Sequence, residues 1–209
     1  LERKPFVKLS GLGTRINTPQ TRDLISRLNL AAITVLNNKN DVLPLHPDLK
    51  EAAILNVGKP EEIEPFDRKM KKYTSFARFQ LRKDLPEAEQ QKLRDSLAAY
   101  RRVIVTMTEQ RLAPYQSFFA KFAPESPVIY VFYTPAKSML QIQRAVSAAE
   151  AVVLAHASRD DVQERVADLL FGKATADGRL SASIGGLFPT GSGVTITPHT
   201  PFHFVPEEY

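Results

Sequence analysis

The stretch PVIYVFYTPAKSMLQIQRAVSAAEAVVLAHA, residues 127–157, decides the fold class of this chain. Its two ends, 127–133 and 150–157, are short apolar runs of the kind that forms buried strands. The segment between them, 137–149, has the length and composition of a helix. A strand, a helix and a second strand in this order predict two parallel strands joined by a crossover helix.

The same alternation continues along the chain. Further strands are expected at 52–58, 73–81 and 102–107, with a last short strand at 179–184. Further helices are expected at 86–100, 114–123 and 159–172. Short apolar strands that alternate with such helices indicate a parallel sheet with helices on both faces. We therefore expect an α/β fold, a three-layer α/β/α sandwich with a mostly parallel sheet of five or six strands.

The segment before these strands is expected to be a connector followed by a helix. Thr18 is a suitable N-cap and Pro19 a good first helical residue. Apolar residues recur at helical spacing from Leu24 to Leu36, and Asn37 then begins a segment that breaks the helix. These signals divide the chain into an N-terminal connector with its first helix at 1–45, a sandwich at 46–185 and a C-terminal connector at 186–209.

The composition is that of a globular chain and excludes several kinds of site. The 209 residues are 43% hydrophobic, but no apolar run is long enough to cross a membrane, and the start lacks a signal-peptide pattern. The chain has no cysteines, so disulfides and thiolate chemistry are excluded. Its formal net charge of +5 is scattered among acids, with the densest basic cluster at 67–73, so no nucleic-acid partner is expected.

The chain also lacks the common motifs for phosphate binding, serine nucleophiles and zinc ligation. The segment GLGTRI at 11–16 begins like a dinucleotide fingerprint, but it has no third glycine and follows no strand. The four histidines are dispersed at His46, His156, His199 and His203. We therefore expect no catalytic nucleophile, no metal and no cofactor in this chain.

Ligands of parallel sheets bind beyond the carboxyl ends of the strands, so the loops there are the candidate sites. These loops begin at Gly58, Thr108, Tyr133 and His156. The acids of the loop at 58–69 suit general acid or base chemistry, since glycoside hydrolysis uses paired carboxylates. The alternative is that they are surface carboxylates without a chemical role.

The loop LAHASRDDVQER at 154–165 holds the candidate substrate-binding residues His156, Arg159 and Asp160. In the functional hypothesis, His156 or Arg159 reaches a ligand at the edge of the sheet. In the alternative, Asp160 or Ser158 caps the following helix, Arg159 is solvated and His156 packs as an ordinary side chain.

Two segments together resemble family 3 glycoside hydrolases. AAITVLNNKNDVLPL at 31–45 resembles the segment that introduces the second domain of these enzymes, and RVADLLFGKATADGRLSASI at 165–184 resembles the segment that ends it. Both occur in the same order and at the same spacing as in the family. The second domain of the family is an α/β/α sandwich, which agrees with the fold expected from the residues.

The finer resemblance is to the β-N-acetylglucosaminidase branch, some members of which continue into a β-lactamase-like serine hydrolase domain. It implies an accessory domain that packs on a barrel domain, helps to wall a carbohydrate site and is exported to the periplasm or cell surface. The nucleophilic Asp and the acid/base His of that branch belong to the barrel, and no residue here matches their motifs. The β-glucosidase branch uses a Glu of the sandwich, but no Glu here has the motif context for that role.

Two departures from the family pattern suit a structural role. The usual Lys-Asn of the first segment is Asn37-Asn38, and the usual Asn-Pro-Ser-Gly of the second is TADG at 175–178. Two alternatives remain open. One is a stand-alone small-molecule binding module of flavodoxin-like or periplasmic-binding shape. The other is an interaction domain that docks a barrel or serine hydrolase partner through an exposed apolar patch.

Overall fold

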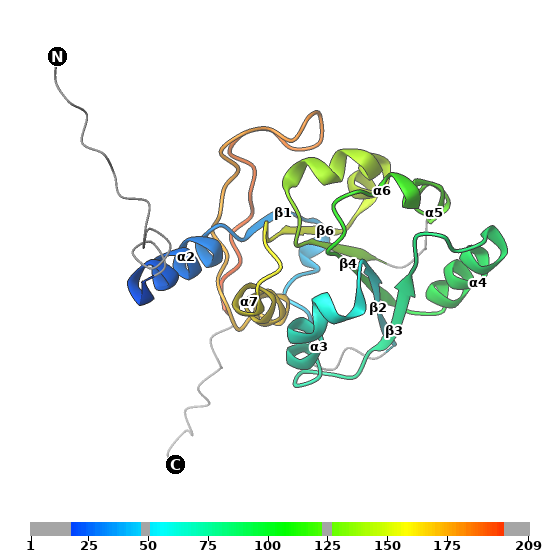
Figure 1. Cartoon of the computed structure of the whole chain (residues 1–209), viewed down its shortest axis with the longest axis horizontal. Helices are drawn as coiled ribbons and strands as arrows, with labels where there is room; N and C mark the ends of the chain where they lie inside the picture. Colours follow the sequence, from blue (N-terminus) through cyan, green and yellow to red (C-terminus); the bar gives the residue numbers. More distant parts are fainter. Residues whose placement is uncertain (1–17, 47–50, 123–126, 199–209) are drawn as a thin grey trace, which may run out of the picture.

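The computed structural model describes residues 18–46, 51–122 and 127–198, and its centre is a six-stranded sheet (Figure 1). The strand order is β1-β6-β5-β4-β2-β3. The strands are β1 Thr34–Asn38, β2 Ala52–Val57, β3 Ala77–Leu81, β4 Arg102–Met107, β5 Val128–Phe132 and β6 Ala151–Leu154. Strands β2 to β6 are parallel, and β1 pairs antiparallel with β6 at one edge. The expected mostly parallel sheet is confirmed.

Helices cover both faces of this sheet. The α-helices are α2 Pro19–Ala31, α3 Glu64–Met70, α4 Glu87–Ala98, α5 Gln116–Lys121, α6 Gln143–Ala148 and α7 Asp160–Leu170. Short 3₁₀ helices occupy Lys39–Asp41, Pro60–Ile63, Ala113–Tyr115 and Ala136–Ile142. Helices α3 and α7 bury their apolar side chains on one face, and α4, α5 and α6 bury theirs on the other.

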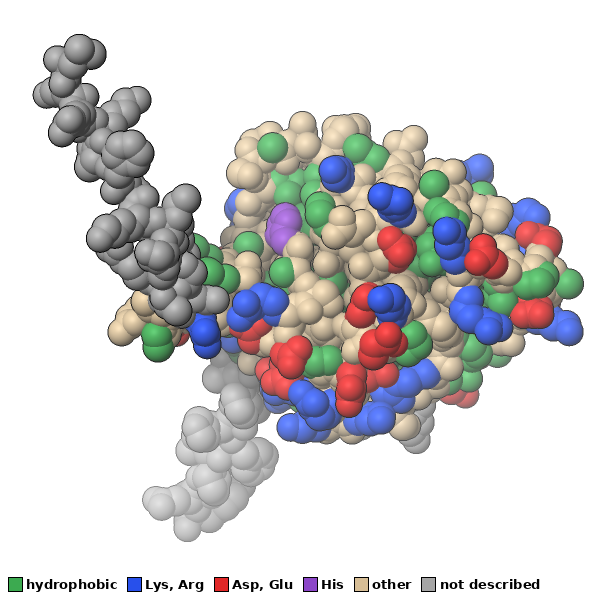
Figure 2. All heavy atoms as spheres, in the orientation of Figure 1, with side chains coloured by type: hydrophobic (Ala, Val, Ile, Leu, Met, Phe, Trp, Pro, Cys, Tyr) green, Lys and Arg blue, Asp and Glu red, His purple; other side chains and the backbone are tan. Residues whose placement is uncertain are grey.

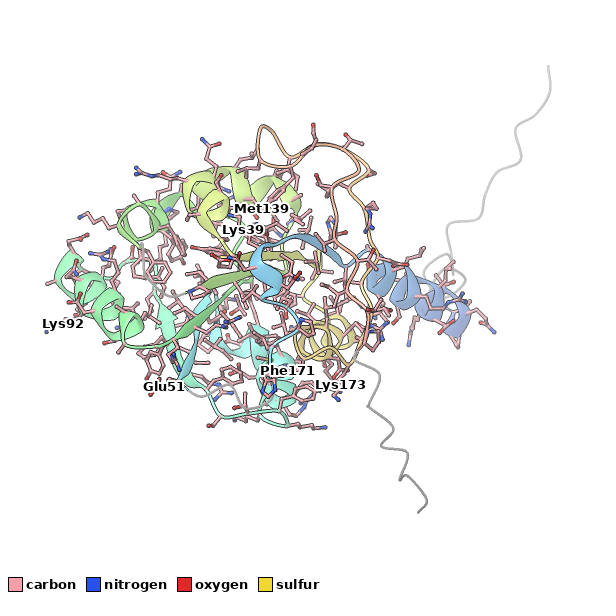
Figure 3. All side chains as sticks on the ribbon, turned by 180° about the vertical axis from the view of Figure 1, so that it is seen from behind. Lys39, Glu51, Lys92, Met139, Phe171 and Lys173 are labelled. Atoms are coloured by element: carbon pink, nitrogen blue, oxygen red, sulfur yellow. The ribbon has the colours of Figure 1, made fainter. Side chains whose placement is uncertain are left out.

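The sheet lies between two apolar cores, and each strand contributes to both because its successive side chains point to opposite faces. Ile129 and Val131 of β5 belong to the core under α3 and α7, whereas Tyr130 belongs to the opposite core. Figure 3 shows Phe171 and Met139, which belong to these two cores, on opposite sides of the sheet. The three-layer α/β/α sandwich expected from the sequence is therefore confirmed.

Helix α2 lies outside the three layers and extends away from the body (Figure 1). It begins as predicted, with Thr18 as N-cap and Pro19 in the first turn, and the Thr18 hydroxyl accepts a hydrogen bond of 3.1 Å from the Thr21 amide. Its packing against the body is mainly with α7.

The expectation that this helix continues through Leu36 is wrong. The helix ends at Ala31, and the following residues form β1. The apolar spacing fits both structures, but β-branched Ile33, Thr34 and Val35 favour a strand. The Val194 amide also donates a hydrogen bond of 2.7 Å to the Val35 carbonyl, so β1 has partners on both sides. The segment 1–45 thus contributes a strand to the sheet.

The loop expected at 58–69 contains structure that the sequence reading missed. Pro60 lies in the first turn of a 3₁₀ helix, and Pro65 lies in the first turn of α3. Proline has no backbone N–H, but the N–H groups of the first turn have no partner within a helix, so no hydrogen bond is lost. Phe66 and Met70 of α3 are fully buried. Among its acids, Asp67 forms an ion pair of 2.6 Å with Arg78, which holds α3 against β3.

The prediction of a strand at 179–184 is also wrong, because this segment makes only an isolated bridge from Ile184 to Phe188. The chain then turns back along itself. The Leu180 amide donates to Ser192, and Ala176 and Ile196 exchange two backbone hydrogen bonds of 2.9 and 3.1 Å. Residues 186–198, expected as a connector, therefore pack on the edge of the body next to β1 (Figure 1).

Charges of both signs mix over the face that carries α3 and α7 (Figure 2). The basic residues of 67–73 contribute ion pairs with acids of α7, namely Arg68 with Glu164 and Lys69 with Asp168, both at 3.0 Å. This mixture is that of a solvated surface. Within the described residues, the helices are too short or too polar to span a membrane.

Candidate functional site

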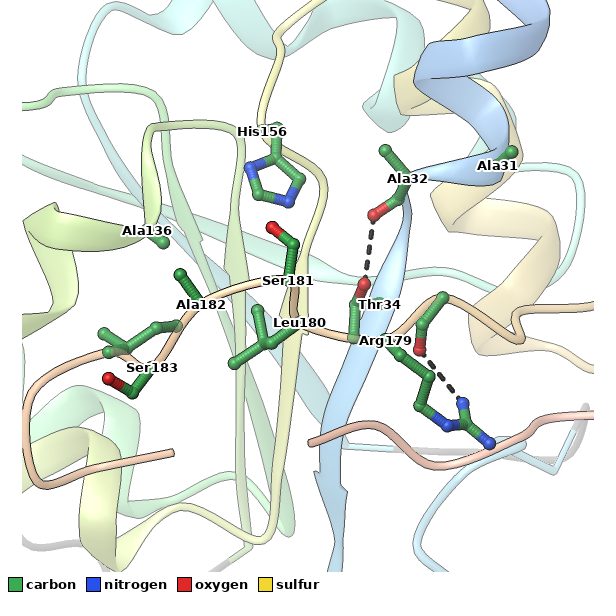
Figure 4. Close-up of a pocket in the computed structure, with 12 residues that line it drawn as sticks. Ala31, Ala32, Thr34, Ala136, His156, Arg179, Leu180, Ser181, Ala182 and Ser183 are labelled. Atoms are coloured by element: carbon green, nitrogen blue, oxygen red, sulfur yellow. Dashed lines mark hydrogen bonds between the residues drawn. The ribbon is translucent and has the colours of Figure 1, made fainter. Parts of the chain in front are cut away.

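His156 follows β6 in an unusual backbone conformation. Its φ is 63°, and the Ala157 amide donates a hydrogen bond of 2.7 Å to the Ala155 carbonyl, so His156 is the central residue of a three-residue turn. Such turns with positive φ are rare and strained for residues other than glycine. The turn directs the imidazole away from the strand and over a neighbouring cavity (Figure 4).

This His156 cavity has a volume of about 300 Å³ and is made by segments far apart in the sequence. Its walls are the end of α2, Thr34 of β1, Ala136 and residues 178–184. In Figure 4 the imidazole and the Ser181 hydroxyl point toward one another across it. The cavity therefore depends on both the N-terminal helix and the segment after α7.

Two hydrogen-bonded side chains fix the walls. The Thr34 hydroxyl donates to the Ala32 carbonyl at 3.0 Å, at the point where α2 gives way to β1. Arg179 donates to the carbonyls of Asp177 and Gly178, both at 3.0 Å, and to the Thr195 hydroxyl at 2.8 Å. The guanidinium thus holds the returning tail against residues 177–178.

The groups that remain in the cavity are neutral. His156 is exposed to solvent, but the protein atoms around it are dense enough to lower the pKa of its imidazole. Its ring is therefore uncharged at neutral pH and can donate one hydrogen bond and accept another. Together with the Ser181 hydroxyl it suits a neutral, hydroxyl-bearing ligand.

Arg159 and Asp160 lie at the start of α7 and do not line this cavity. Arg159 donates a hydrogen bond of 3.1 Å to Asp161, which also accepts one from Ser26 of α2. Burial alone raises the pKa of Asp161, but the hydrogen bonds from Ser26 and Arg159 outweigh it and lower the pKa overall. The Ser26–Asp161 contact ties α2 to α7, and Arg159 supports it.

Asp160 is exposed, and neither it nor Ser158 caps α7 as the alternative expected. The Ser158 hydroxyl instead donates to the Glu62 carbonyl at 3.1 Å and accepts from Gln163 at 3.0 Å. Of the three candidate residues, His156 is the one that lines the cavity described above. His199 and His203 lie outside the described residues, and the described part of the chain contains no cluster of potential metal ligands.

The sequence reading missed the segment 178–184 as a wall of the site. Gly178 is the signal that identifies it, because a Cβ there would lie 2.5 Å from both the Ile33 carbonyl and the Thr34 hydroxyl. The segment passes so close to the start of β1 that only glycine fits. The role of this glycine is thus a close backbone approach.

Comparison with solved structures places this architecture among known enzymes. A fungal multi-domain GH3 β-N-acetylglucosaminidase matches 93% of the chain with a TM-score of 0.64 and 17% identity. The chain shares the fold of one part of a family 3 glycoside hydrolase. The β-N-acetylglucosaminidase of family 3 from Paenibacillus sp. str. FPU-7 matches 84% of it at 16% identity and a TM-score of 0.54. The β-glucoside phosphorylase BglX matches 97% at 16% identity and a TM-score of 0.55.

The match covers only part of these proteins. The chain spans 22% of the fungal protein, 35% of the Paenibacillus enzyme and 36% of BglX. No family profile and no curated protein matches the sequence. At identities of 16–17%, the likeness establishes the fold and leaves the activity to be argued from the site.

Proposed function

We propose that this chain is the accessory α/β/α domain of a family 3 glycoside hydrolase and packs, through α2, on another domain of a longer protein. The observation that carries the proposal is the exposure of α2. Its apolar side chains Leu24, Ile25 and Leu28 are 52%, 43% and 60% exposed. None of the residues of α2, all of which the structure describes, is buried.

The side chains of Leu24, Ile25 and Leu28 are not buried against the body of the protein. Leu24 and Leu28 are four residues apart and therefore lie on one face of the helix, with Ile25 beside them. Surface helices normally turn such a stripe toward a core, and a contiguous exposed apolar patch marks an interaction site. Since α2 is held by α7 through Ser26 and Asp161, the stripe is presented in a fixed position.

The place of the stripe suggests what its partner does. Ala31 and Ala32 at the end of α2 line the His156 cavity, so a domain seated on α2 borders that cavity. A neutral imidazole and a serine hydroxyl suit the hydroxyl groups of a sugar. On this proposal the cavity forms part of the wall of a carbohydrate site, with His156 as the contacting residue.

The proposal leaves glycoside hydrolysis to the partner domain. That reaction uses two carboxyl groups on either side of the scissile bond. Among the residues that line the His156 cavity, all within the described part of the chain, none is Asp or Glu. The proposed substrate of the whole protein is a terminal β-linked N-acetylglucosamine or a related sugar, as for two of the matched enzymes. A barrel, a serine hydrolase domain and export from the cytoplasm are part of the same proposal.

The test is glycoside hydrolysis by the purified chain. We expect no nitrophenol release from 4-nitrophenyl β-N-acetylglucosaminide or β-glucoside above the rate in buffer. His156→Ala is the matched variant, since a rate due to a contaminant is the same in both preparations. Turnover by the chain that His156→Ala abolishes would contradict the proposal, because the chain would then carry the chemistry itself.

A further inference from the structure

A second cavity lies where the strand order of the sheet reverses. The chain passes from β2 to β3 on one side and then returns to place β4 on the other side of β2. The connection after β2 leads to α3 on one face, and that after β4 leads to α5 on the opposite face. Diverging connections of this kind open a crevice at the carboxyl ends of the strands, where open α/β sheets bind ligands.

The crevice is a cavity of about 580 Å³, nearly twice the volume of the His156 cavity. Its walls are the loops that follow β2, β3 and β4. The volume falls within the range of small-molecule sites, about 300–1,000 Å³. We call it the switch-point cavity.

A row of polar side chains supports the cavity from inside the sheet. Thr106, Asn56 and Gln80 are neighbours in register on β4, β2 and β3. The Thr106 hydroxyl donates to Asn56 at 3.1 Å, and Asn56 donates to Gln80 at 3.0 Å. Asn56 and Thr106 are buried, and such groups are costly inside a sheet unless they are hydrogen-bonded. This row is bonded along its length.

The row ends on the loop that forms the rim. Gln80 donates to the Gly58 carbonyl at 2.6 Å, and Asn56 donates to the Lys59 carbonyl at 3.3 Å. Gly58 has a φ of 140°, and a Cβ there would lie only 1.9 Å from the Thr108 hydroxyl. The loops after β2 and β4 are therefore in contact. The polar row holds the first of them, and the Thr108 amide of the second donates a hydrogen bond of 3.0 Å to the Val57 carbonyl. A rim held in this way is organised before any ligand arrives.

The walls of the cavity carry an excess of positive charge. Four cationic side chains line it against two acidic ones, Glu62 and Glu109; the cations are Lys59, Arg82, Lys83 and Arg111. Glu62 lies 4.0 Å from Lys59, and Glu109 accepts a hydrogen bond of 2.9 Å from the Arg111 amide.

Two of the cations remain unmatched. Among the described residues, no carboxylate pairs with Lys83 or with the guanidinium of Arg111. An anion in the cavity could therefore pair with two cations without breaking an existing ion pair.

We propose that the switch-point cavity binds a small phosphate monoester, with Lys83 and Arg111 holding the phosphate group. A guanidinium binds phosphate oxygens in pairs, and an ammonium adds a compact charge. The cavity is larger than one phosphate, so the alcohol part of the monoester lies toward Gln80 and Thr108 on the polar side. This site is independent of α2 and of carbohydrate binding at His156.

The experiment is isothermal titration calorimetry of the chain with AMP and glucose 6-phosphate. Adenosine and glucose, which lack the phosphate group, are the controls. We expect saturable binding of at least one phosphorylated probe at up to millimolar concentration and none of its uncharged counterpart. The double variant K83A/R111A should weaken that binding about tenfold or more, because two charged hydrogen bonds are lost. Both side chains are exposed, so the variant should fold, which a thermal unfolding curve checks.

Lys173→Ala is the matched control. Lys173 is exposed beyond the carboxyl end of α7 and does not line the cavity, yet its loss changes the net charge in the same direction. We expect binding by this variant to equal that of the unaltered chain. The proposal is overturned if neither phosphorylated probe binds, if the uncharged counterparts bind as well, or if K83A/R111A and Lys173→Ala behave alike.

Discussion

The two cavities at the carboxyl edge of the sheet differ in what builds them. The His156 cavity is assembled mainly from α2, the start of β1 and the segment after α7, which lie toward the two ends of the chain in sequence, and Ala136 and His156 complete it from the loops after β5 and β6. The switch-point cavity is built from the loops after β2, β3 and β4, and the sheet supports it directly. One has a single cation, Arg179, among its lining residues and lies beside an exposed apolar helix, whereas the other has four cations and is built by the loops of the sheet.

Under the proposed function, this difference separates the segments that face a neighbouring domain from those that do not. A cavity made by the outer segments can be shared with a second domain, because those segments are where the apolar stripe of α2 lies. A cavity made by the sheet needs no such partner. The two sites should therefore respond to different substitutions.

The largest effect is expected at the His156 cavity from Gly178→Ala. The new methyl group would lie 2.5 Å from the carbonyl of Ile33, the residue directly before β1, and this backbone atom cannot move aside without disturbing the start of the strand. We expect the free energy of unfolding to fall by about 2 to 3 kcal/mol in urea denaturation.

Gly186→Ala is the control for this substitution, because a Cβ at that position has no neighbour within 4 Å. Its free energy of unfolding should stay within about 0.5 kcal/mol of the unaltered chain. If the two alanine variants were equally stable, the segment 178–184 would not be packed against β1 and the His156 cavity would have no such wall.

A smaller loss is expected at the switch-point cavity from Gly58→Ala. The substitution strains the backbone at a φ of 140° and forces the Thr108 hydroxyl to move, since that atom would lie 1.9 Å from the new Cβ. Because a side-chain hydroxyl yields more easily than a backbone carbonyl, we expect about 1 to 2 kcal/mol.

The Thr108→Ala background sharpens the test. Removing the hydroxyl should make Gly58→Ala less costly than it is in the unaltered chain, and a double-mutant cycle measures the coupling. Strictly additive effects would mean that the loops after β2 and β4 are not in contact.

Acid should weaken the link between α2 and α7 through Asp161. Its pKa is lower in the folded chain than in the unfolded one, so its contribution to stability is present above the unfolded pKa, about 4. That contribution is lost as the pH falls through the folded pKa. Asp161→Asn removes it at every pH.

The two chains are compared by thermal unfolding at pH 7 and pH 3. Asp161→Asn should unfold at a lower temperature than the unaltered chain at pH 7, and the gap should narrow at pH 3. A gap that stayed constant would show that the carboxylate charge does not contribute to the contact of Ser26 with Asp161.

Much of the fold could be predicted because the central strands are buried on both faces and read as apolar runs. RVIVTM at Arg102–Met107 became β4 with the expected bounds, and the αβ alternation on either side of it predicted the layers. The α3 helix was missed because Pro60 and Pro65 read as loop residues, although both stand in first turns. Edge strand β1 was missed because its pairing with β6 is a contact distant in sequence.

The sites were less predictable because they too depend on contacts between residues that are distant in sequence. His156 could be placed at a strand end from the local pattern, but its facing residue Ser181 belongs to a segment expected to form a strand. The loops at Gly58 and Thr108 could be named as candidates from the sequence. That they meet at one cavity depends on β2 lying next to β4, which only the strand order reveals.

The central claim, that α2 docks a neighbouring domain, is tested most directly by hydrolysis of 4-nitrophenyl β-N-acetylglucosaminide by the full-length product of the encoding gene. The variant is Leu24→Ser combined with Leu28→Ser, both exposed here, which should leave the stability of this chain within about 0.5 kcal/mol. We predict that the same variant lowers the hydrolysis rate or the unfolding temperature of the full-length product. Unchanged rate and unchanged unfolding temperature of the full-length product would contradict the account.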